Sequence, residues 1–306
     1  MKRCTTTLAL HALLVGGIAL LHALPCGAAD GVAEINQLAV DEALYPCDDG
    51  SPGAPCTLWR AGSYRLTGNL TVTDPDGTGV SITAAGVTLD LGGFAVLGPN
   101  TCTFNGATAT VSCSPGGLGR GIYSSAEAVT IRNGTVAGFG RWGISLGSLS
   151  RVEDVVVRGA EESGIRTGAH SVVVDTMVAV AGTSGLRLGD GGRAQGVILH
   201  HCGHPYALDG QTEVSVLDSV VLEGGTAFSA GDGSLVAGCV AHDSVGSYIH
   251  VGERSAVVGS VSSSGTRGIS AGTGAGWAGN VLYGYSSAPF GGVQMGANLC
   301  NGAVCP

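Results

Sequence analysis

The sequence predicts an all-β fold, a parallel β-helix that coils once about every 21 residues. Two columns of residues recur at this step, and their period is typical of a solenoid, in which each repeat packs on its neighbours. The first column contains only glycine: Gly147, Gly168, Gly189, Gly210, Gly231, Gly252 and Gly272. The second contains mostly small or turn-forming residues: Asn133, Asp154, Asp175, Gly196, Leu217, Gly238, Gly259 and Asn280.

The segments between the columns have the period of β-strands. Several repeats open with glycine and a branched apolar residue, as in Gly143-Ile144 and Gly164-Ile165, and continue with alternating stretches such as Val129-Thr130-Ile131. Alternation of apolar and polar residues indicates strands rather than helices. Three short strands and three turns fit into 21 residues, as a parallel β-helix requires. Leucine-rich repeats need an L-x-x-L-x-L pattern, which this chain lacks.

The N-terminal residues 1–29 have the three regions of a secretory signal sequence. Lys2 and Arg3 supply the positive charge, residues 8–24 are mainly apolar, and Gly27-Ala28-Ala29 supplies the small residues of a cleavage region. We therefore expect residues 30–306 to be exported as a single β-helix domain. The export predicts a secreted protein, whether periplasmic, extracellular or held at the cell surface.

Two alternatives to cleavage fit the same residues less well. A membrane anchor fits less well because His11 and His22 interrupt the apolar segment and no basic stop follows it. A lipid attached to Cys26 fits less well because Pro25 precedes it. The mature chain is therefore expected to begin after Ala29 and to carry no transmembrane anchor.

The charge of the mature chain excludes nucleic acid as a partner. Loss of Lys2 and Arg3 changes the formal net charge from −9 to −11, and no basic stripe offsets the negative charge. Lys2 is also the only lysine of the chain.

The mature cysteines fall into three close pairs and two single residues. Because export allows disulfides to form, we expect three local bridges: Cys47–Cys56, Cys102–Cys113 and Cys300–Cys305. Cys202 and Cys239 lie at different phases of the repeat and two turns apart, too far to bond, and are expected to be buried thiols. No C-x-x-C spacing indicates a metal site.

Two segments are expected to close the ends of the coil. Residues 31–45 carry Val32, Ile35, Leu38 and Leu44 at near-helical spacing, which predicts a short amphipathic capping helix. The stretch after Asn280 is the candidate cap at the other end.

One insertion is expected near residues 99–120. Val87-Thr88-Leu89-Asp90 parallels Val129-Thr130-Ile131-Arg132 at a separation of two periods. The residues between them, with Cys102 and Cys113, therefore predict a disulfide-stapled loop that stands off the solenoid.

Several of these segments resemble the right-handed parallel β-helix repeat proteins of the pectin-lyase-like superfamily, over nearly all of residues 31–306. The resemblance rests on Gly62-Ser63-Tyr64-Arg65-Leu66, on Val87-Thr88-Leu89-Asp90-Leu91-Gly92-Gly93, on the Gly-Ile openings and on Gly296-Ala297-Asn298-Leu299-Cys300. It implies a right-handed coil and makes polysaccharide the first ligand class to test. The superfamily includes polysaccharide lyases and proteins without activity, so the resemblance specifies no reaction.

The candidate binding residues lie on the strand that opens each repeat. Its outward column is expected to be Tyr123, Ser145, Arg166, Arg187, Leu208, Ser229, His250 and Ser270. From this column we expect Tyr123, Arg166, Arg187 and His250 to bind ligand. Arg166 and Arg187 should lie about 4.8 Å apart, one interstrand step, and could hold an anionic sugar between them.

If the protein is an enzyme, the candidate catalytic residues are Arg166, Arg187, Glu162 and Asp190, with an arginine as base or as carboxylate clamp. A surface cluster of ion pairs is the alternative explanation of these charges, and such clusters contribute little to stability.

Other polar clusters have structural explanations. The Asn and Asp residues of the second column are expected to form turns. His200 and His201 should face opposite sides of a strand, which argues against a shared metal, and no metal or cofactor is predicted. With no mature lysine, the R-I-K signature of polygalacturonases cannot occur.

Two functions of different classes follow from the sequence. The first is an exported, non-catalytic β-helix that binds glycan or serves as a surface or matrix component. The second is a polysaccharide lyase or another carbohydrate-active enzyme that acts on acidic polysaccharide, and it rests on the fold and on the Arg166–Arg187 pair.

Overall fold

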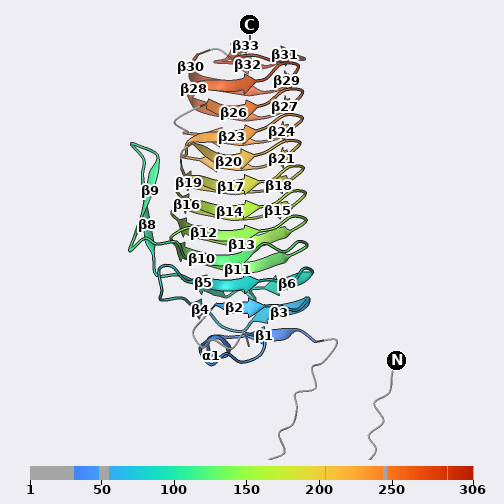
Figure 1. Ribbon diagram of the computed structural model, residues 1–306. Helices are drawn as coiled ribbons and strands as arrows, with labels where there is room; N and C mark the ends of the chain where they lie inside the picture. The colour runs from blue at the N-terminus through green and yellow to red at the C-terminus, as the bar shows by residue number, and fades with distance from the viewer. Residues whose placement is uncertain (1–30, 48–54, 204, 244–246, 288, 306) are drawn as a thin grey trace, which may run out of the picture. The chain divides into compact units, whose positions relative to one another are not determined.

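The computed structural model describes residues 31–47, 55–203, 205–243, 247–287 and 289–305. The predicted signal sequence, residues 1–29, lies outside the described residues. The described chain coils into a right-handed parallel β-helix of about 11 turns, which confirms the predicted fold class (Figure 1). The described residues from Val32 onward form one compact unit.

Each full turn adds one strand to each of three faces of the coil. The strands of the first face are β2 Cys56–Leu58, β5 Thr78–Ile82, β10 Arg120–Ser124, β12 Trp142–Leu146, β14 Ser163–Thr167, β17 Ser184–Leu188, β20 Tyr206–Gly210, β23 Thr226–Ala230, β26 Ser247–Val251 and the end of β28 Val261–Ala271.

The second face begins the ladder at the N-terminal end. Its strands are β1 Ala33–Ile35, β3 Gly62–Leu66, β6 Val87–Asp90, the first halves of β11 Thr130–Phe139 and β13 Arg151–Ala160, β15 Val172–Val174, β18 Arg193–Gln195, β21 Ser215–Leu217, β24 Leu235–Ala237, β27 Ala256–Val258, β29 Gly276–Ala278 and β31 Val293–Gln294.

The third face closes the coil. Its strands are β4 Leu70–Thr71, β7 Ala95–Leu97, the second halves of β11 and β13, β16 Met177–Ala181, β19 Ile198–Cys202, β22 Val220–Leu222, β25 Val240–His242, the start of β28, β30 Val281–Ser287 and β32 Leu299–Cys300. The short strand β33 Ala303–Val304 returns antiparallel to β32.

Apolar side chains of the first face stack in register inside the coil. The fully buried ladder consists of Val80, Ile122, Ile144, Ile165, Leu186, Leu208, Phe228, Ile249 and Ile269. Because each residue packs on its counterpart one turn away, the core is a column of branched side chains that runs the length of the solenoid.

The glycines that open the repeats face this interior, where no side chain fits. A Cβ at Gly143 would lie 2.4 Å from Cγ1 of Val157, and a Cβ at Gly164 would lie 2.3 Å from Cγ1 of Val178. Glycine at this position therefore lets the first face approach the third face closely.

The main glycine column marks a corner where turns stack backbone on backbone. A Cβ at Gly168 would lie 2.6 Å from the amide nitrogen of Ser148, and one at Gly189 would lie 2.5 Å from the carbonyl carbon of Gly168. The prediction was wrong at Gly210, which pairs with Leu188 inside β20. The turn between Arg187 and Asp209 is 22 residues long, so Gln211 occupies the corner instead.

The second column lies at another corner of the coil, where the backbone has left-handed φ values. Asn133, Asp154 and Asp175 have φ values of 58°, 53° and 47°, as expected for Asx turns. The prediction was wrong at Leu217 and Asn280, because the neighbouring residues Asp218 and Gly279 carry the positive φ. Asn280 is buried instead, and its side chain accepts a hydrogen bond from the Ser260 amide.

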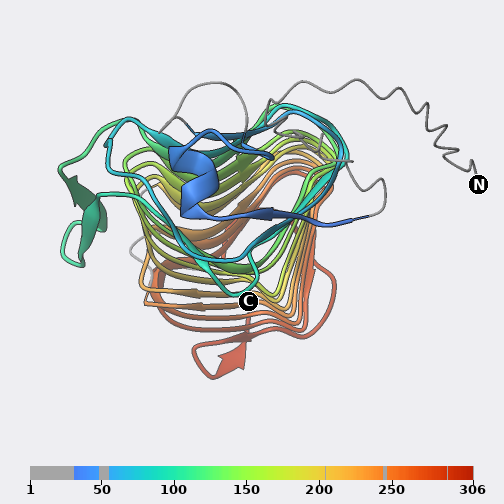
Figure 2. The ribbon, with the colours of Figure 1, turned by 90° about the horizontal axis from the view of Figure 1, so that it is seen from below.

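The N-terminal cap differs from the predicted 31–45 helix. Residues 33–35 form β1, which pairs with β3, and only α1 Gln37–Asp41 is helical. Asn36 caps α1 by accepting a hydrogen bond from the Ala39 amide. Val32, Leu38 and Leu44 are exposed, whereas Ile35 and Ala39 join the core. Pairing to the first sheet edge therefore prevails over the helical pattern, and Figure 2 shows α1 lying over the open end of the coil.

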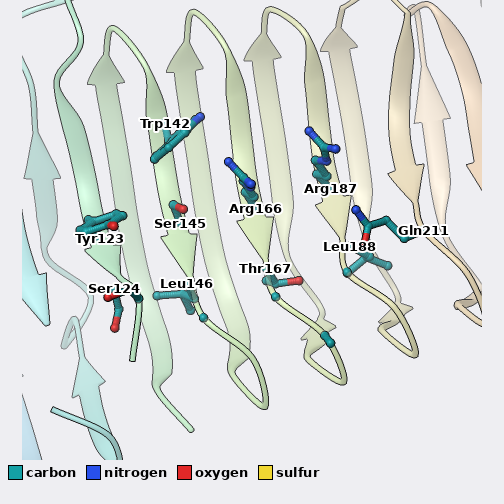
Figure 3. Close-up of a pocket in the computed structure, with 15 residues that line it drawn as sticks. Tyr123, Ser124, Trp142, Ser145, Leu146, Arg166, Thr167, Arg187, Leu188 and Gln211 are labelled. Atoms are coloured by element: carbon teal, nitrogen blue, oxygen red, sulfur yellow. The ribbon is translucent and has the colours of Figure 1, made fainter. Parts of the chain in front are cut away.

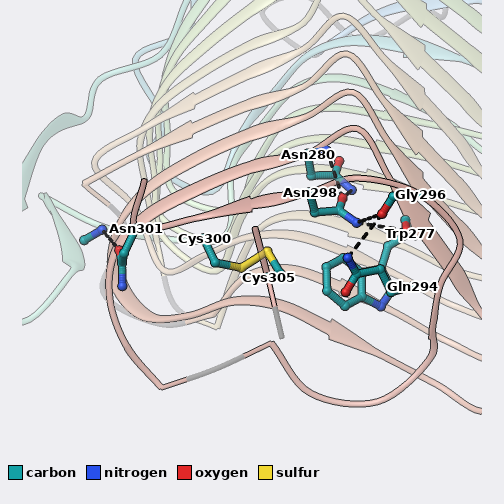
Figure 4. The surroundings of a disulfide bond; sticks show 9 residues. Trp277, Asn280, Gln294, Gly296, Asn298, Cys300, Asn301 and Cys305 are labelled. Carbon is teal, nitrogen blue, oxygen red and sulfur yellow. Dashed lines mark hydrogen bonds between the residues drawn. A yellow bond between two sulfur atoms is a disulfide. The ribbon is translucent and has the colours of Figure 1, made fainter. Parts of the chain in front are cut away.

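The C-terminal segment closes the other end, as expected. Asn280 donates from its amide to Oδ1 of Asn298, and Asn298 in turn donates to the carbonyl of Trp277 (Figure 4). Cys300 and Cys305 form a disulfide beside these amides. The buried amides satisfy the last turn of the ladder, which has no further turn to pair with.

All three predicted disulfides are present: Cys47–Cys56, Cys102–Cys113 and Cys300–Cys305. The thiols of Cys202 and Cys239 are free and buried, as predicted. Burial raises the pKa of Cys202 to about 12 and that of Cys239 to about 11. Over the described part of the chain, no helix has the length and apolar character needed to cross a membrane.

The predicted insertion is a two-stranded hairpin, β8 Thr101–Asn105 and β9 Thr110–Ser114, closed by Cys102–Cys113. Thr88 and Thr130 are direct partners across it, so one turn of the ladder continues on the other side of the insertion. The hairpin packs beside β13 and β16 on the third face (Figure 1).

The close backbone contacts at the glycine corner predict that an added side chain there lowers the stability of the protein. Gly168→Ala should destabilise the protein by about 1–3 kcal/mol, because its Cβ would overlap backbone atoms of the preceding turn. The control is Gly68→Ala, where no atom lies within 4 Å of the added Cβ and no loss is expected. Urea unfolding followed by circular dichroism measures both variants, and equal midpoints would contradict backbone stacking at this corner.

Because burial raises the pKa values of the two free thiols, we expect these cysteines to resist alkylation. At pH 8 Cys202 and Cys239 should remain protonated and resist alkylation by iodoacetamide in the native protein, because only the thiolate reacts. Both should be labelled after unfolding in guanidinium, as peptide mass mapping would show. Rapid labelling of either residue in the native state would show that it is not enclosed by the coil.

Candidate functional site: a groove on the first face

A groove of about 380 Å³ crosses four neighbouring strands of the first face, β10, β12, β14 and β17. Tyr123, Trp142, Arg166 and Arg187 point outward from these strands along it, one from each (Figure 3). Three interstrand steps of about 4.8 Å make this row about 14 Å long. The lining is completed by small and polar residues, Ser124, Ser125, Ser145, Leu146, Gly147, Thr167, Gly168, Ala169, Leu188, Gly189 and Gln211.

The outward column that the sequence predicted is correct except at one residue. Tyr123, Ser145, Arg166 and Arg187 are successive partners across the ladder. The next partner is Asp209 rather than Leu208, which is fully buried. The 22-residue turn shifts the register by one position, and a shift of one residue exchanges the two sides of a strand. The column then continues through Ser229 and His250 to Ser270.

Trp142 was not predicted from the sequence, although its ring is central to the groove. Strict alternation from the buried Ile144 would place Trp142 inside the coil. Gly143 and Ile144 both face the interior, however, and this break in alternation turns Trp142 outward. The Trp142 and Tyr123 rings stack with centroids 6.4 Å apart and an angle of 21° between their planes.

Three arginines surround the Trp142 ring. The guanidinium carbons lie 5.0 Å, 4.1 Å and 5.3 Å from the ring centroid for Arg120, Arg141 and Arg166. Arg120 also lies 4.6 Å from the Tyr123 ring. Cation–π contacts at such distances hold the guanidinium groups against the aromatic faces.

The predicted pair Arg166–Arg187 is present. The two residues are direct partners on β14 and β17, and both line the groove. Arg187 forms an ion pair with Asp209, with 3.4 Å between Nε and Oδ2. Within the described residues, no carboxylate lies within ion-pair distance of Arg166.

The predicted carboxylates do not join this pair. Nε of Arg141 donates to Oε2 of Glu162 at 3.3 Å, so Glu162 lies at the Arg141 end of the groove. Asp190 accepts hydrogen bonds from the hydroxyl and amide of Thr212, and these bonds lower the pKa of Asp190. Neither residue lines the groove. His250 is three turns beyond Arg187 and is also outside the lining.

Two buried polar atoms at the groove have no hydrogen-bond partner among the described residues, Oγ1 of Thr167 and Nε of Arg120. Buried polar atoms are normally satisfied, and water within the structure is the usual partner where no protein group serves. The described lining contains no carboxylate and no histidine. The groove therefore offers aromatic surface, hydroxyl groups, among them the phenol of Tyr123, and guanidinium donors.

A second cluster lies on the third face, where the sequence argument about His200 and His201 was wrong. Their rings stack with centroids 3.8 Å apart instead of facing opposite sides. His201 has a φ of 53°, and this left-handed conformation breaks the alternation of β19. Nε2 of His201 lies 3.0 Å from Oε2 of Glu223. Burial and the neighbouring His201 lower the pKa of His200.

Comparison with known proteins identifies the fold. No protein-family model matches the chain, and no curated protein matches it. Among solved structures, the Dettilon tailspike protein has a TM-score of 0.53 and 13% identity, and the match covers 80% of this chain and 61% of that one.

Two further solved structures are similar to this chain over most of its length. A tailspike protein of E. coli bacteriophage HK620, in complex with pentasaccharide, has a TM-score of 0.49 and 11% identity, covering 80% of this chain and 56% of that one. The catalytic unit of a GH87 α-1,3-glucanase from Streptomyces thermodiastaticus has a TM-score of 0.38 and 15% identity, covering 79% and 62%. The chain thus spans less than two thirds of each of these structures. The architecture shared with the Dettilon tailspike protein, together with the ladder described above, shows that this chain is a right-handed parallel β-helix repeat protein.

Proposed function

We propose that the protein is an exported, non-catalytic β-helix that binds acidic polysaccharide in the groove on its first face. The observation that carries the proposal is the composition of the groove. Aromatic rings and arginines line up along four successive turns, and no carboxylate lies among the described lining residues. Export rests on the signal-like residues 1–29 and agrees with the three disulfides.

The exposed aromatic surface of the groove suits the apolar face of a sugar ring. Tyr123 supplies this surface, because it is partly exposed, whereas Trp142 is only 8% exposed and supports Tyr123 from beneath the arginines that pack around its own ring. Such side chains supply a large contact area with little loss of conformational entropy, and their edges still allow hydrogen bonds. Gln211 is exposed and lines the same groove with Ser145, so both side chains can bond sugar hydroxyl groups.

The charges of the groove suit an anionic ligand. Four arginines gather around it, Arg120, Arg141, Arg166 and Arg187, whereas the carboxylates paired with them are Glu162 and Asp209. The surplus is positive, although the whole chain has a formal net charge of −9. A planar guanidinium binds a carboxylate through two parallel hydrogen bonds, which favours uronate units over neutral sugars.

The same groups argue against catalysis. Acid–base chemistry on a glycosidic linkage needs a group that can give or take a proton. Guanidinium groups stay protonated at neutral pH, and the only other ionisable side chain among the described lining residues is the phenol of Tyr123, which has no carboxylate or histidine beside it in that lining. The lyase alternative is favoured by one observation, the absence of a described carboxylate partner for Arg166 beside a second arginine. We assign that residue to binding the uronate carboxylate.

The proposal predicts the effect of removing both arginines. The double variant Arg166→Ala, Arg187→Ala should bind polygalacturonate or alginate at least tenfold more weakly than the unchanged protein, because charged hydrogen bonds contribute about 1.5–3 kcal/mol each. Isothermal titration at low and moderate salt measures the affinities, and the difference should shrink as salt screens the charges.

Arg193→Ala is the control for this experiment. Arg193 is an exposed arginine on β18 of the second face, so its removal changes the net charge without touching the groove. An equal loss of affinity in both variants would show that the effect comes from the net charge of the protein. Unchanged affinity in the double variant would show that the groove is not the binding site.

The proposal also predicts no turnover. Incubation of acidic polysaccharides with the protein should yield no unsaturated uronate by ultraviolet absorbance and no new reducing ends. The double arginine variant provides the background for both assays. Product formed by the unchanged protein and lost in the variant would establish the lyase alternative.

A further inference from the structure

A further corner of the coil lies at the C-terminal end of the third-face strands. Successive turns place a left-handed residue there, and three of them carry large side chains: Val180, His201 and Glu223, with φ values of 60°, 53° and 50°. Glycine occupies the same corner in earlier turns, at Gly138 and Gly159. Left-handed backbone is costly for a β-branched residue and for other bulky residues.

This corner brings two histidines and a carboxylate together. His200 pairs with Leu222 across the ladder, so the residues that follow them, His201 and Glu223, are neighbours at the corner. One donor atom from each of His200, His201 and Glu223 can be chosen so that all three lie within 4.8 Å of one another. His200 and His201 are partly buried, whereas Glu223 is exposed and able to adjust.

We propose that His200, His201 and Glu223 form a binding site for a transition-metal ion of the Zn²⁺ class. Two imidazole nitrogens and one carboxylate oxygen are a common donor set for zinc, with bonds of about 2.0–2.2 Å. Donors around a tetrahedral ion are about 3.4 Å apart on this geometry, so the side chains need to close by about 1.4 Å. Nε2 of His201 already lies 3.0 Å from Oε2 of Glu223, so this closing has to bring His200 and the other two donors together. Imidazole ligands disfavour Ca²⁺ and Mg²⁺.

The stapled hairpin shields one side of this cluster. The Phe104 ring, on β8, stacks on the His201 ring with centroids 4.5 Å apart and an angle of 12° between their planes. Beside it is a hollow of about 200 Å³ lined by Phe104, Gly106, Glu223, Gly224 and Asp243. An apolar shell that limits solvent access strengthens metal–ligand bonds. The hollow leaves room for water or a further carboxylate in the fourth position.

A bound ion would tie two successive turns of the coil together, and through Phe104 it would also fix the hairpin. This role is independent of the proposed function, because the cluster lies on the third face and shares no residue with the groove. The failure of either proposal therefore leaves the other unaffected.

The experiment is a zinc titration of the full exported chain without a histidine tag, after removal of metals with EDTA. Calorimetry should show one zinc ion per chain, and saturating zinc should raise the melting temperature, since a ligand that binds only the folded state stabilises it. Cobalt at the same site should give the visible absorption bands of a tetrahedral ion. Calcium and magnesium should leave the melting temperature unchanged.

Two variants should each weaken zinc binding at least tenfold, His201→Ala and Glu223→Gln. His170→Ala is the matched control for the first, because His170 is an exposed histidine with nearly the same left-handed φ, 55°. Glu223→Gln alters an exposed side chain, so loss of folding cannot account for its effect. The proposal would be overturned if the unchanged protein bound no zinc, if both variants bound zinc as tightly as the unchanged protein, or if calcium stabilised the protein as much as zinc does.

Discussion

The structure depends on one constraint, the continuous parallel hydrogen-bond ladder between successive turns. Each backbone group pairs with its counterpart one turn away, as Ile144 does with Ile165 and Ile165 with Leu186. This pairing fixes the separation of turns at about 4.8 Å, and at that separation some corners have no room for a Cβ atom. The glycines at positions 168 and 189 follow directly, because their α-carbons lie against the backbone of the turn before. The period of the sequence is thus the length of one circuit of the ladder.

Because of the same ladder, residues that are far apart in the sequence are neighbours on the surface. Tyr123, Arg166 and Arg187 are far apart in number but lie along one groove, because each occupies the same position of its own turn. A solenoid of this kind can build an extended binding surface from single residues contributed by each repeat. The positive groove on an acidic chain is such a surface, since it needs only a few arginines at one phase.

Several clusters of charged and aromatic side chains lie where the sequence departs from the regular repeat. The 22-residue turn replaces an apolar residue of the outward column by Asp209, which then pairs with Arg187. The left-handed conformation of His201 places its ring against that of His200 and beside Glu223. The hairpin inserted between two turns covers this second cluster with Phe104. The longer turn and the inserted hairpin are irregularities of the repeat, whereas the left-handed position of His201 recurs in successive turns and only its residue type is unusual.

The sequence by itself determined the class of fold, the length of a turn, the three disulfides and the two buried thiols, because these follow from periodicity and from short spacings along the chain. It also placed Arg166 and Arg187 side by side, since their separation is one period. Only the tertiary structure decided that Trp142 faces the groove, that Asp209 replaces Leu208, and that His200 and His201 meet. Those outcomes depend on local breaks in strand alternation, and a break of one residue exchanges inside and outside without leaving a periodic signal. The partners of Glu162 and Asp190 also depend on the register of neighbouring turns. Each carboxylate bonds to a group that the ladder brings within reach, Arg141 for Glu162 and Thr212 for Asp190.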